Sequence, residues 1–153
     1  MKRLIVTILA FCALTTAVCA QENAIGIRIG AMKGFGMELS YQTFLNDINR
    51  IEVDAGFRVY DHHAALTAAG GYQWHWFLAG GFGAYGGPAA MMSWTLWPYD
   101  HKFNLGLGAQ VGFDYQFHAP IQVLLDFRPT YNFFGGLLYG FDPYVSLGFR
   151  YAF

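Results

Sequence analysis

The most constraining feature of the sequence is where its charged residues fall within segments of alternating polarity. Along 50–60, for example, Val53 and Phe57 alternate with Asp54 and Arg58. A period of two is the geometry of a β-strand, whose successive side chains point to opposite faces. Nine charged residues lie in such segments, all on the face shared with Gly, Gln and Ser: Arg28, Glu38, Glu52, Asp54, Arg58, Asp114, Asp126, Arg128 and Arg150. The opposite face is aliphatic and aromatic, so the sequence predicts strands with one charge-free face.

The alternation and the turn signals between segments predict eight strands. We expect them at 24–32, 37–44, 50–60, 66–76, 77–86, 102–117, 121–131 and 143–153. The fifth is so rich in glycine that its facing is ambiguous. Two long connections, 87–101 and 129–142, are expected at the same end of the sheet.

The composition indicates whether lipid or water surrounds these strands. The chain is 55% hydrophobic, 19% aromatic and only 12% charged, against roughly 25% charged in soluble domains. After the first 20 residues, no segment approaches the roughly 20 continuous apolar residues of a membrane helix. We therefore expect an all-β fold, a closed antiparallel up-and-down transmembrane β-barrel of eight strands. The alternative is a soluble barrel with the apolar face inside, but an eight-stranded lumen has too little room for so many aromatic side chains.

The N-terminal segment has the pattern of a cleaved signal peptide. A basic start precedes an apolar run over 4–14, and Val18 and Ala20 suit cleavage after residue 20. The expected domains are thus a signal peptide, 1–20, and a barrel, 21–153.

Both cysteines, Cys12 and Cys19, lie in this leader, so no disulfide is expected in the mature chain. Cys19 as a lipoprotein acceptor is the alternative, although Val18 stands where a small residue is usual.

The leader, the eight strands, the hairpin at 113–129 and the closing sequence GFRYAF at 148–153 resemble the small eight-stranded outer-membrane β-barrel proteins of the OmpA/OmpX type. The resemblance implies the outer membrane of a Gram-negative bacterium, with lipid, lipopolysaccharide and the barrel assembly machinery as partners. It also implies a C-terminal assembly signal formed by Phe149, Tyr151 and Phe153. No periplasmic domain is expected, because the sequence ends with the last strand.

The charged face is expected to line the lumen. Its four arginines and five acids nearly balance, which predicts a structural ionic network that fills the barrel. Strand pairing is expected to bring Asp114 and Arg150 to the level of Leu124. A narrow pore is the alternative reading of the same charges, although eight strands leave little room for water.

Catalytic residues, cofactors and metal sites are not expected. Outer-membrane deacylases of lipid A carry a His-x-Ser pair, and no histidine here has Ser two residues on. Ser40 and Ser146 lie on the lumenal face as small fillers, and adjacent side chains such as His62 and His63 point apart on an extended chain. A net charge of −1 without a basic patch argues against nucleic acid.

The two long connections are more apolar than expected for loops that only contact water. Six residues are candidate surface contacts: Met92, Trp94, Trp97, Tyr99, Phe133 and Phe134. They could pack against lipid, extend the barrel wall as a hairpin, or bind an extracellular protein partner. The expected function is a structural or surface-interaction role, with a lipid A-modifying enzyme or a narrow pore as alternatives.

Overall fold

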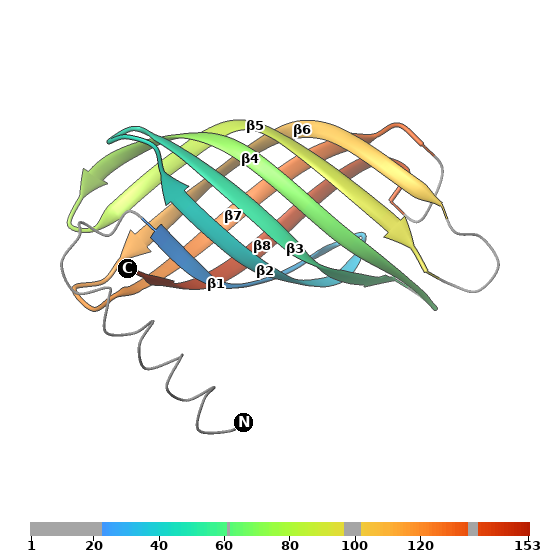
Figure 1. Cartoon of the computed structure of the whole chain (residues 1–153), viewed down its shortest axis with the longest axis horizontal. Helices are drawn as coiled ribbons and strands as arrows, with labels where there is room; N and C mark the ends of the chain where they lie inside the picture. Colours follow the sequence, from blue (N-terminus) through green and yellow to red (C-terminus); the bar gives the residue numbers. More distant parts are fainter. Residues whose placement is uncertain (1–22, 61, 97–101, 135–137) are drawn as a thin grey trace, which may run out of the picture.

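Eight antiparallel strands close into a barrel in this computed structural model, which describes residues 23–60, 62–96, 102–134 and 138–153 (Figure 1). The strands are β1 (Asn23–Met32), β2 (Gly34–Phe44), β3 (Asn49–Tyr60), β4 (His63–Ala79), β5 (Phe82–Thr95), β6 (Phe103–Gln116), β7 (Ile121–Asn132) and β8 (Gly140–Ala152). Each strand pairs with its sequence neighbours, and β1 also pairs with β8. The predicted eight-stranded up-and-down barrel is therefore confirmed.

The described part of the chain contains no helix long and apolar enough to cross a membrane.

The two ends of the barrel differ in the length of their connections. At the terminal end, where β1 begins and β8 ends, the strands are joined by 45–48, 80–81 and 117–120. At the opposite end, here called the loop end, the longer connections 96–102 and 133–139 join β5 to β6 and β7 to β8. Short turns at one end and long loops at the other are typical of outer-membrane barrels, whose long loops face outward.

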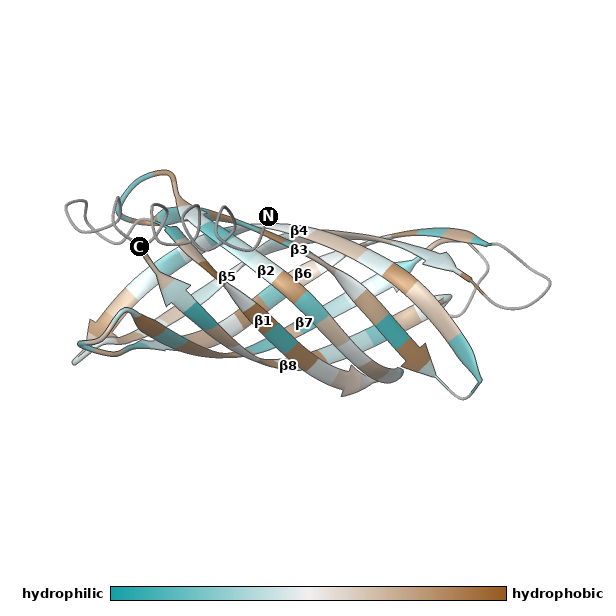
Figure 2. Cartoon of the chain, turned by 60° about the horizontal axis from the view of Figure 1, so that its bottom comes forward, coloured by the Kyte–Doolittle hydropathy of each residue, from teal (hydrophilic) through white to brown (hydrophobic). Residues whose placement is uncertain are grey.

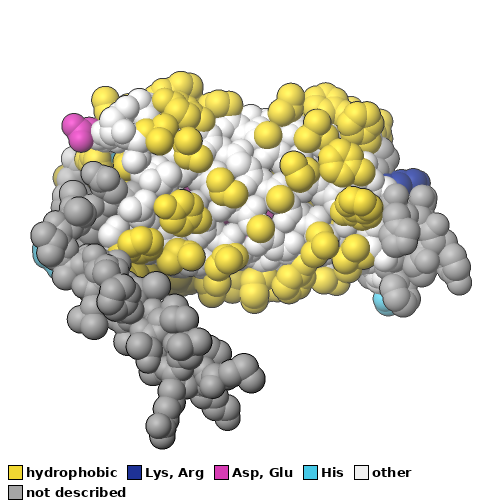
Figure 3. Space-filling view, in the orientation of Figure 1, with side chains coloured by type: hydrophobic (Ala, Val, Ile, Leu, Met, Phe, Trp, Pro, Cys, Tyr) yellow, Lys and Arg dark blue, Asp and Glu magenta, His cyan; other side chains and the backbone are white. Residues whose placement is uncertain are grey.

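The outer wall is apolar and the lumen is polar. Figure 2 shows the alternation along individual strands, and Figure 3 shows hydrophobic side chains spread over the barrel exterior. Ile27 on β1, Leu39 on β2 and Leu107 on β6 are among the large apolar side chains that point outward. Lipid solvates such a surface, whereas water would not.

The boundaries predicted for the fifth strand are wrong. β4 continues to Ala79, and a two-residue turn follows in which Gly80 (φ 59°) and Gly81 (φ 89°) both have positive φ. Such turns match the twist of the strands they join and favour glycine at both positions. β5 then runs as far as Thr95, through most of the expected long loop, which shrinks to 96–102.

The period-two signal of β5 is weak for a physical reason. Its outward positions include Ala84, Gly86 and Ala90, while its inward positions include the larger Tyr85 and Met91. Size therefore does not mark the lipid face here as it does on the other strands. The other seven predicted strands overlap the observed ones.

The predicted register at the C-terminus is wrong by two residues. Asp114 pairs with Leu124, as expected, but Leu124 pairs with Gly148 on β8. Arg150 lies opposite Gln122, closer to the terminal end. Gly148, and not Arg150, therefore lies at the level of Asp114 and Leu124.

We predict that Leu39→Arg destabilises the barrel by about 2–4 kcal/mol, the cost of placing a guanidinium against hydrocarbon near the bilayer midplane. Leu39 lies in the middle of β2 and is 57% exposed on the outer wall. Urea unfolding in lipid vesicles measures the change, with Leu39→Val as the apolar control. An arginine variant as stable as this control would show that position 39 does not face lipid.

Candidate functional site: the lumenal charge network

The lumen collects every charged residue of the described strands. The nine residues identified from the sequence are all at most 4% exposed in the barrel. Two further buried charges join them, Arg50 at the start of β3 and Asp142 at the start of β8. Neither residue was predicted to be lumenal, because Arg50 lies at a predicted strand end and Asp142 in a predicted connection. Their even numbers could have indicated it, because residue 50 continues the inward series 52 and 54, and residue 142 continues the inward series 144 and 146.

Arg28 on β1 is the centre of the network. Its guanidinium pairs with Glu52, with Asp54 at 2.9 Å and with Asp126 at 2.5 Å, and it donates to Ser146 Oγ at 2.7 Å. These partners come from β3, β7 and β8. A single side chain thus links strands from around the barrel.

A second group of ion pairs lies nearer the loop end. Arg128 pairs with Asp54 at 2.5 Å and with Glu38 at 3.6 Å. Arg58 pairs with Asp142 and lies 3.9 Å from Glu38. Both arginines therefore contact carboxylates from two different strands.

Arg150 extends the network toward the terminal end. It pairs with Glu52 on β3 and donates to Ser40 Oγ at 2.7 Å and to Gln42 Oε1 at 2.6 Å on β2. Glu52 is therefore shared between Arg28 on β1 and Arg150 on β8, and these two strands pair with each other where the barrel closes.

A smaller cluster lies at the terminal end. Asp114 accepts a hydrogen bond from Arg50 at 2.6 Å and is 3.0 Å from Nε2 of His75. The Arg50 guanidinium lies over the Tyr85 ring, 4.1 Å from its centroid. His75 alternates with the outward Trp74 and Trp76, but its pairing with Asp114 needs the fold to be known.

The loop end is covered by apolar side chains. Leu138, in the connection between β7 and β8, is fully buried and belongs to a cluster with Met91 and Ala69. The neighbouring Tyr139 carbonyl accepts a hydrogen bond from Lys33 at 2.9 Å, which ties this connection to the β1–β2 turn. The 138–139 segment thus folds back onto the mouth of the barrel.

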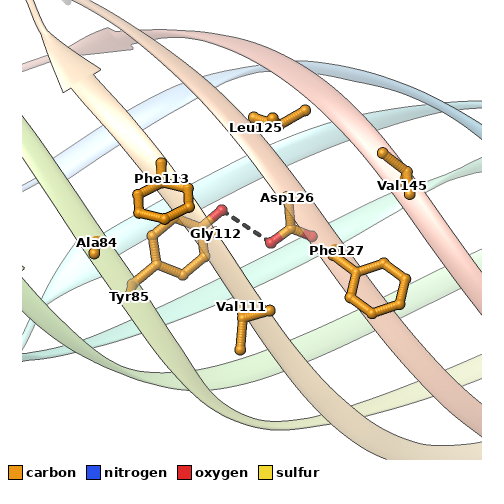
Figure 4. Close-up of a pocket in the computed structure, with 9 residues that line it drawn as sticks. All are labelled: Ala84, Tyr85, Val111, Gly112, Phe113, Leu125, Asp126, Phe127 and Val145. Carbon is orange, nitrogen blue, oxygen red and sulfur yellow. Dashed lines mark hydrogen bonds between the residues drawn. The ribbon is translucent and has the colours of Figure 1, made fainter.

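A groove of about 370 Å³ marks the outer wall over β5, β6 and β7 and reaches Val145 on β8 (Figure 4). Gly112 is part of its floor, and a Cβ on this residue would strike the Leu125 carbonyl and the Tyr85 hydroxyl. Behind the floor that hydroxyl donates to Asp126 at 2.9 Å, so the network comes close to the wall here. The rim is formed by apolar outward side chains, among them Phe113 and Phe127.

The candidate contact residues are divided between wall and loop. Met92 and Trp94 lie in β5 and point outward, so they belong to the barrel wall. Phe133 and Phe134 follow β7 at the loop end and are 50% and 54% exposed. Trp97 and Tyr99 lie outside the described residues.

The proposed C-terminal signal lies at the end of β8. Phe149 and Tyr151 point outward from this strand, next to β1. Phe153 follows β8, and its backbone exchanges hydrogen bonds with that of Asn23.

The chemistry available in the lumen is ion pairing. Within the described ranges, no three His, Cys, Asp or Glu side chains gather as a metal site would require. His62, between β3 and β4, and His63, the first residue of β4, are both exposed. The His75–Asp114 pair is completed by Arg50, a permanent cation that cannot serve as a nucleophile.

Comparison with known proteins identifies the fold. No protein-family model matches the sequence, and no curated protein matches it. Among solved structures, the chain is similar to the N-terminal β-barrel domain of Pseudomonas aeruginosa OprF (TM-score 0.63, 18% identity, 86% of this chain and 96% of that one). It is also similar to Neisserial surface protein A (TM-score 0.62, 15% identity, 86% and 94%). A third similar structure is the Yersinia pestis outer membrane protein Ail (TM-score 0.54, 13% identity, 86% and 99%).

These similarities show a shared fold, that of small outer-membrane barrels. The apolar outer wall, on which the described strands place no charge, agrees with the outer-membrane location implied by this fold.

We predict that Arg28→Met destabilises the barrel by about 3–5 kcal/mol, because it leaves buried carboxylates without their cation. Adding Asp126→Asn should restore part of this loss, because one of the carboxylates paired with Arg28 is then neutral. Urea unfolding in lipid vesicles compares the single and double variants. Equal stability of Arg28→Met and the unchanged protein would contradict a stabilising network.

Proposed function

We propose that the chain is a non-conducting structural barrel of the outer membrane whose loop end binds an extracellular protein partner. The observation that carries this proposal is the filled lumen. Ion-paired arginines span it from Arg58 near the loop end to Arg50 near the terminal end. A function that depends on passage through the barrel is disfavoured, and the outer surface remains as the place of interaction.

The lumenal network supports the structural part of the proposal. Six carboxylates and five guanidiniums lie buried among the described residues, and paired charges are tolerated where isolated ones are not. A permeating ion would have to displace these pairs, as at Arg28, where three carboxylates surround one guanidinium. We infer that the network keeps the barrel rigid and closed.

Phe133 and Phe134 support the binding part. Their backbone N–H groups donate to Leu105 O at 3.0 Å and to Asn104 Oδ1 at 3.2 Å, which fixes the chain as it leaves β7. Their side chains nevertheless remain half exposed. Ordered and exposed aromatic side chains lose little entropy on binding and are enriched in protein interfaces.

Lipopolysaccharide is the competing partner for the same surface. Its phosphates favour clusters of Lys and Arg, whereas the described loop-end connections carry two separate lysines, Lys33 between β1 and β2 and Lys102 before β6. A protein surface with apolar pockets matches Phe133 and Phe134 better. Lipid packing without a specific partner is the remaining interpretation, which the experiment below distinguishes.

Export and assembly of the chain form the last part of the proposal. The leader at 1–20 would deliver the chain to the periplasm. The assembly machinery would then recognise the terminal strand through Phe149, Tyr151 and Phe153. The outward side chains of Phe149 and Tyr151 are accessible for such a contact.

We predict that the purified protein gives no discrete conductance steps in planar lipid bilayers, because its lumen is occupied by side chains. A porin reconstituted in the same membranes is the positive control. Reproducible unit steps that persist after repeated purification would contradict a closed barrel and favour the narrow pore.

We predict that a photo-crosslinking phenylalanine analogue at position 134 forms a discrete protein adduct on intact cells. The same analogue at Phe113, an outward wall residue, is the matched control and should label only lipid. Phe133→Ser should reduce the adduct at 134 without changing the amount of folded barrel. A discrete adduct with lipopolysaccharide alone would identify lipopolysaccharide as the partner, and labelling of bulk lipid equal to that at position 113 would indicate lipid packing; either result would contradict a protein partner.

A further inference from the structure

Small residues line the inner wall of the barrel near the loop end, over β4, β5 and β6. One row of paired inward residues consists of Ala69, Met91 and Gly106. The next row toward the terminal end consists of Gly71, Ala89 and Gly108. Apart from Met91, none of these side chains is larger than a methyl group. The wall therefore leaves room for side chains from elsewhere in the fold.

Leu138, from the connection between β7 and β8, takes up part of this room. Its side chain is fully buried against the first of the two rows. The adjacent Tyr139 carbonyl accepts the exposed hydrogen bond from Lys33 at 2.9 Å. Gly140, at the start of β8, has a φ of 83° and open space where a Cβ would lie. Leu138 and the Lys33 hydrogen bond thus fasten the segment 138–139, here called the strap, and Gly140 gives it a hinge.

Polar side chains surround the buried leucine. Thr67 on β4 pairs with Ser93 on β5, and Ser93 pairs with Asn104 on β6, one step closer to the loop end than the first row of small residues. On β7, Asn132 and Thr130 continue the two rows of small residues. All five polar side chains are at most 5% exposed. The strap therefore inserts an apolar side chain into a polar part of the lumen.

Four of these polar side chains have an atom that makes no hydrogen bond within the described part of the chain. The atoms are Thr67 Oγ1, Asn104 Nδ2, Thr130 Oγ1 and Asn132 Oδ1. A leucine side chain offers them neither a donor nor an acceptor. Buried polar atoms without partners destabilise the arrangement that buries them. The closed strap is therefore opposed by the groups that it covers.

The two asparagines select a ligand that both donates and accepts hydrogen bonds. Asn104 Oδ1 accepts a hydrogen bond from the Phe134 N–H at 3.2 Å, which leaves the Asn104 amide nitrogen as a donor. Asn132 Nδ2 donates to the Gly140 carbonyl at 3.4 Å, which leaves Oδ1 as an acceptor. The neighbouring Asp142 already has an arginine partner, so charge does not select a charged ligand. Neutral hydroxyl groups meet both requirements.

We propose that the strap is displaceable and that the polar space beneath it binds the hydroxyl groups of a saccharide, with Leu138 as the occupant of the closed barrel. A free oligosaccharide or the oligosaccharide of lipopolysaccharide can supply these groups at the loop end. Displacement of the strap opens no pore, because the ion pairs around Arg28 lie beyond it. The inference does not rest on the proposed protein partner, because the outward side chains of Phe133 and Phe134 take no part in it.

Thiol labelling tests the strap without a ligand. The sequence has no cysteine after residue 20, so Ser93→Cys gives the barrel a single thiol in the covered polar row. Leu138→Ala should speed its modification by N-ethylmaleimide at least about tenfold, the effect on an opening equilibrium of losing a buried leucine side chain. Ala152→Cys, buried at the terminal end, is the matched control and should react at the same rate with either residue at 138. An unchanged rate at position 93 would overturn the strap.

Protection of the same thiol tests the ligand in the Leu138→Ala background. Maltotriose is the probe for a free saccharide, and lipopolysaccharide with its core oligosaccharide is the probe for the membrane source. We expect saturable protection, weakened about two- to tenfold by Thr130→Val through the loss of one hydrogen bond. Protection by maltotriose would identify a free saccharide as sufficient, whereas protection by lipopolysaccharide alone would identify the membrane source.

Triethylene glycol dimethyl ether is the matched control ligand, because its oxygens accept hydrogen bonds but none donates. Equal protection by this ether would overturn the recognition of hydroxyl groups. Absence of protection by both saccharide probes would overturn the proposed site.

Discussion

The lack of hydrogen-bonding partners in hydrocarbon governs both surfaces of this barrel. The backbone meets the constraint by closing β1 onto β8, which leaves no unpaired sheet edge. The side chains meet the constraint by their facing: apolar residues such as Leu39 face outward, and every charged residue of the described strands faces the lumen. The two solutions depend on each other, since a charged face is tolerable only inside a closed wall.

The lumen is consequently a core made of charges. In a soluble barrel, apolar packing would fill this space, whereas here guanidinium groups do so while binding carboxylates from several strands. Arg28 and Arg128 share Asp54, and Arg28 and Arg150 share Glu52. Small partners such as Ser146 complete the coordination of these large side chains. Volume and charge are thus satisfied by the same residues.

The alternating pattern was sufficient to predict the barrel, its strand number and the inward position of nine charges. It failed where size did not follow facing, as in β5, whose outward Ala84 and Gly86 gave no apolar signal. It also failed at the register of β8, because alternation is unchanged by a shift of two residues and a long connection does not fix the shift. The pairing of His75 with Asp114 could not be predicted, because β5 lies between their strands.

The position of Arg28 has a consequence for the order of assembly. Arg28 lies on the first strand, yet its carboxylate partners come from β3 and β7, so its charge is compensated only when distant parts of the chain have met. An inserted but open sheet would hold an uncompensated guanidinium beside lipid. Entry of the strands into the bilayer and closure of the ring must therefore proceed as one cooperative event, with no stable half-built intermediate in the membrane.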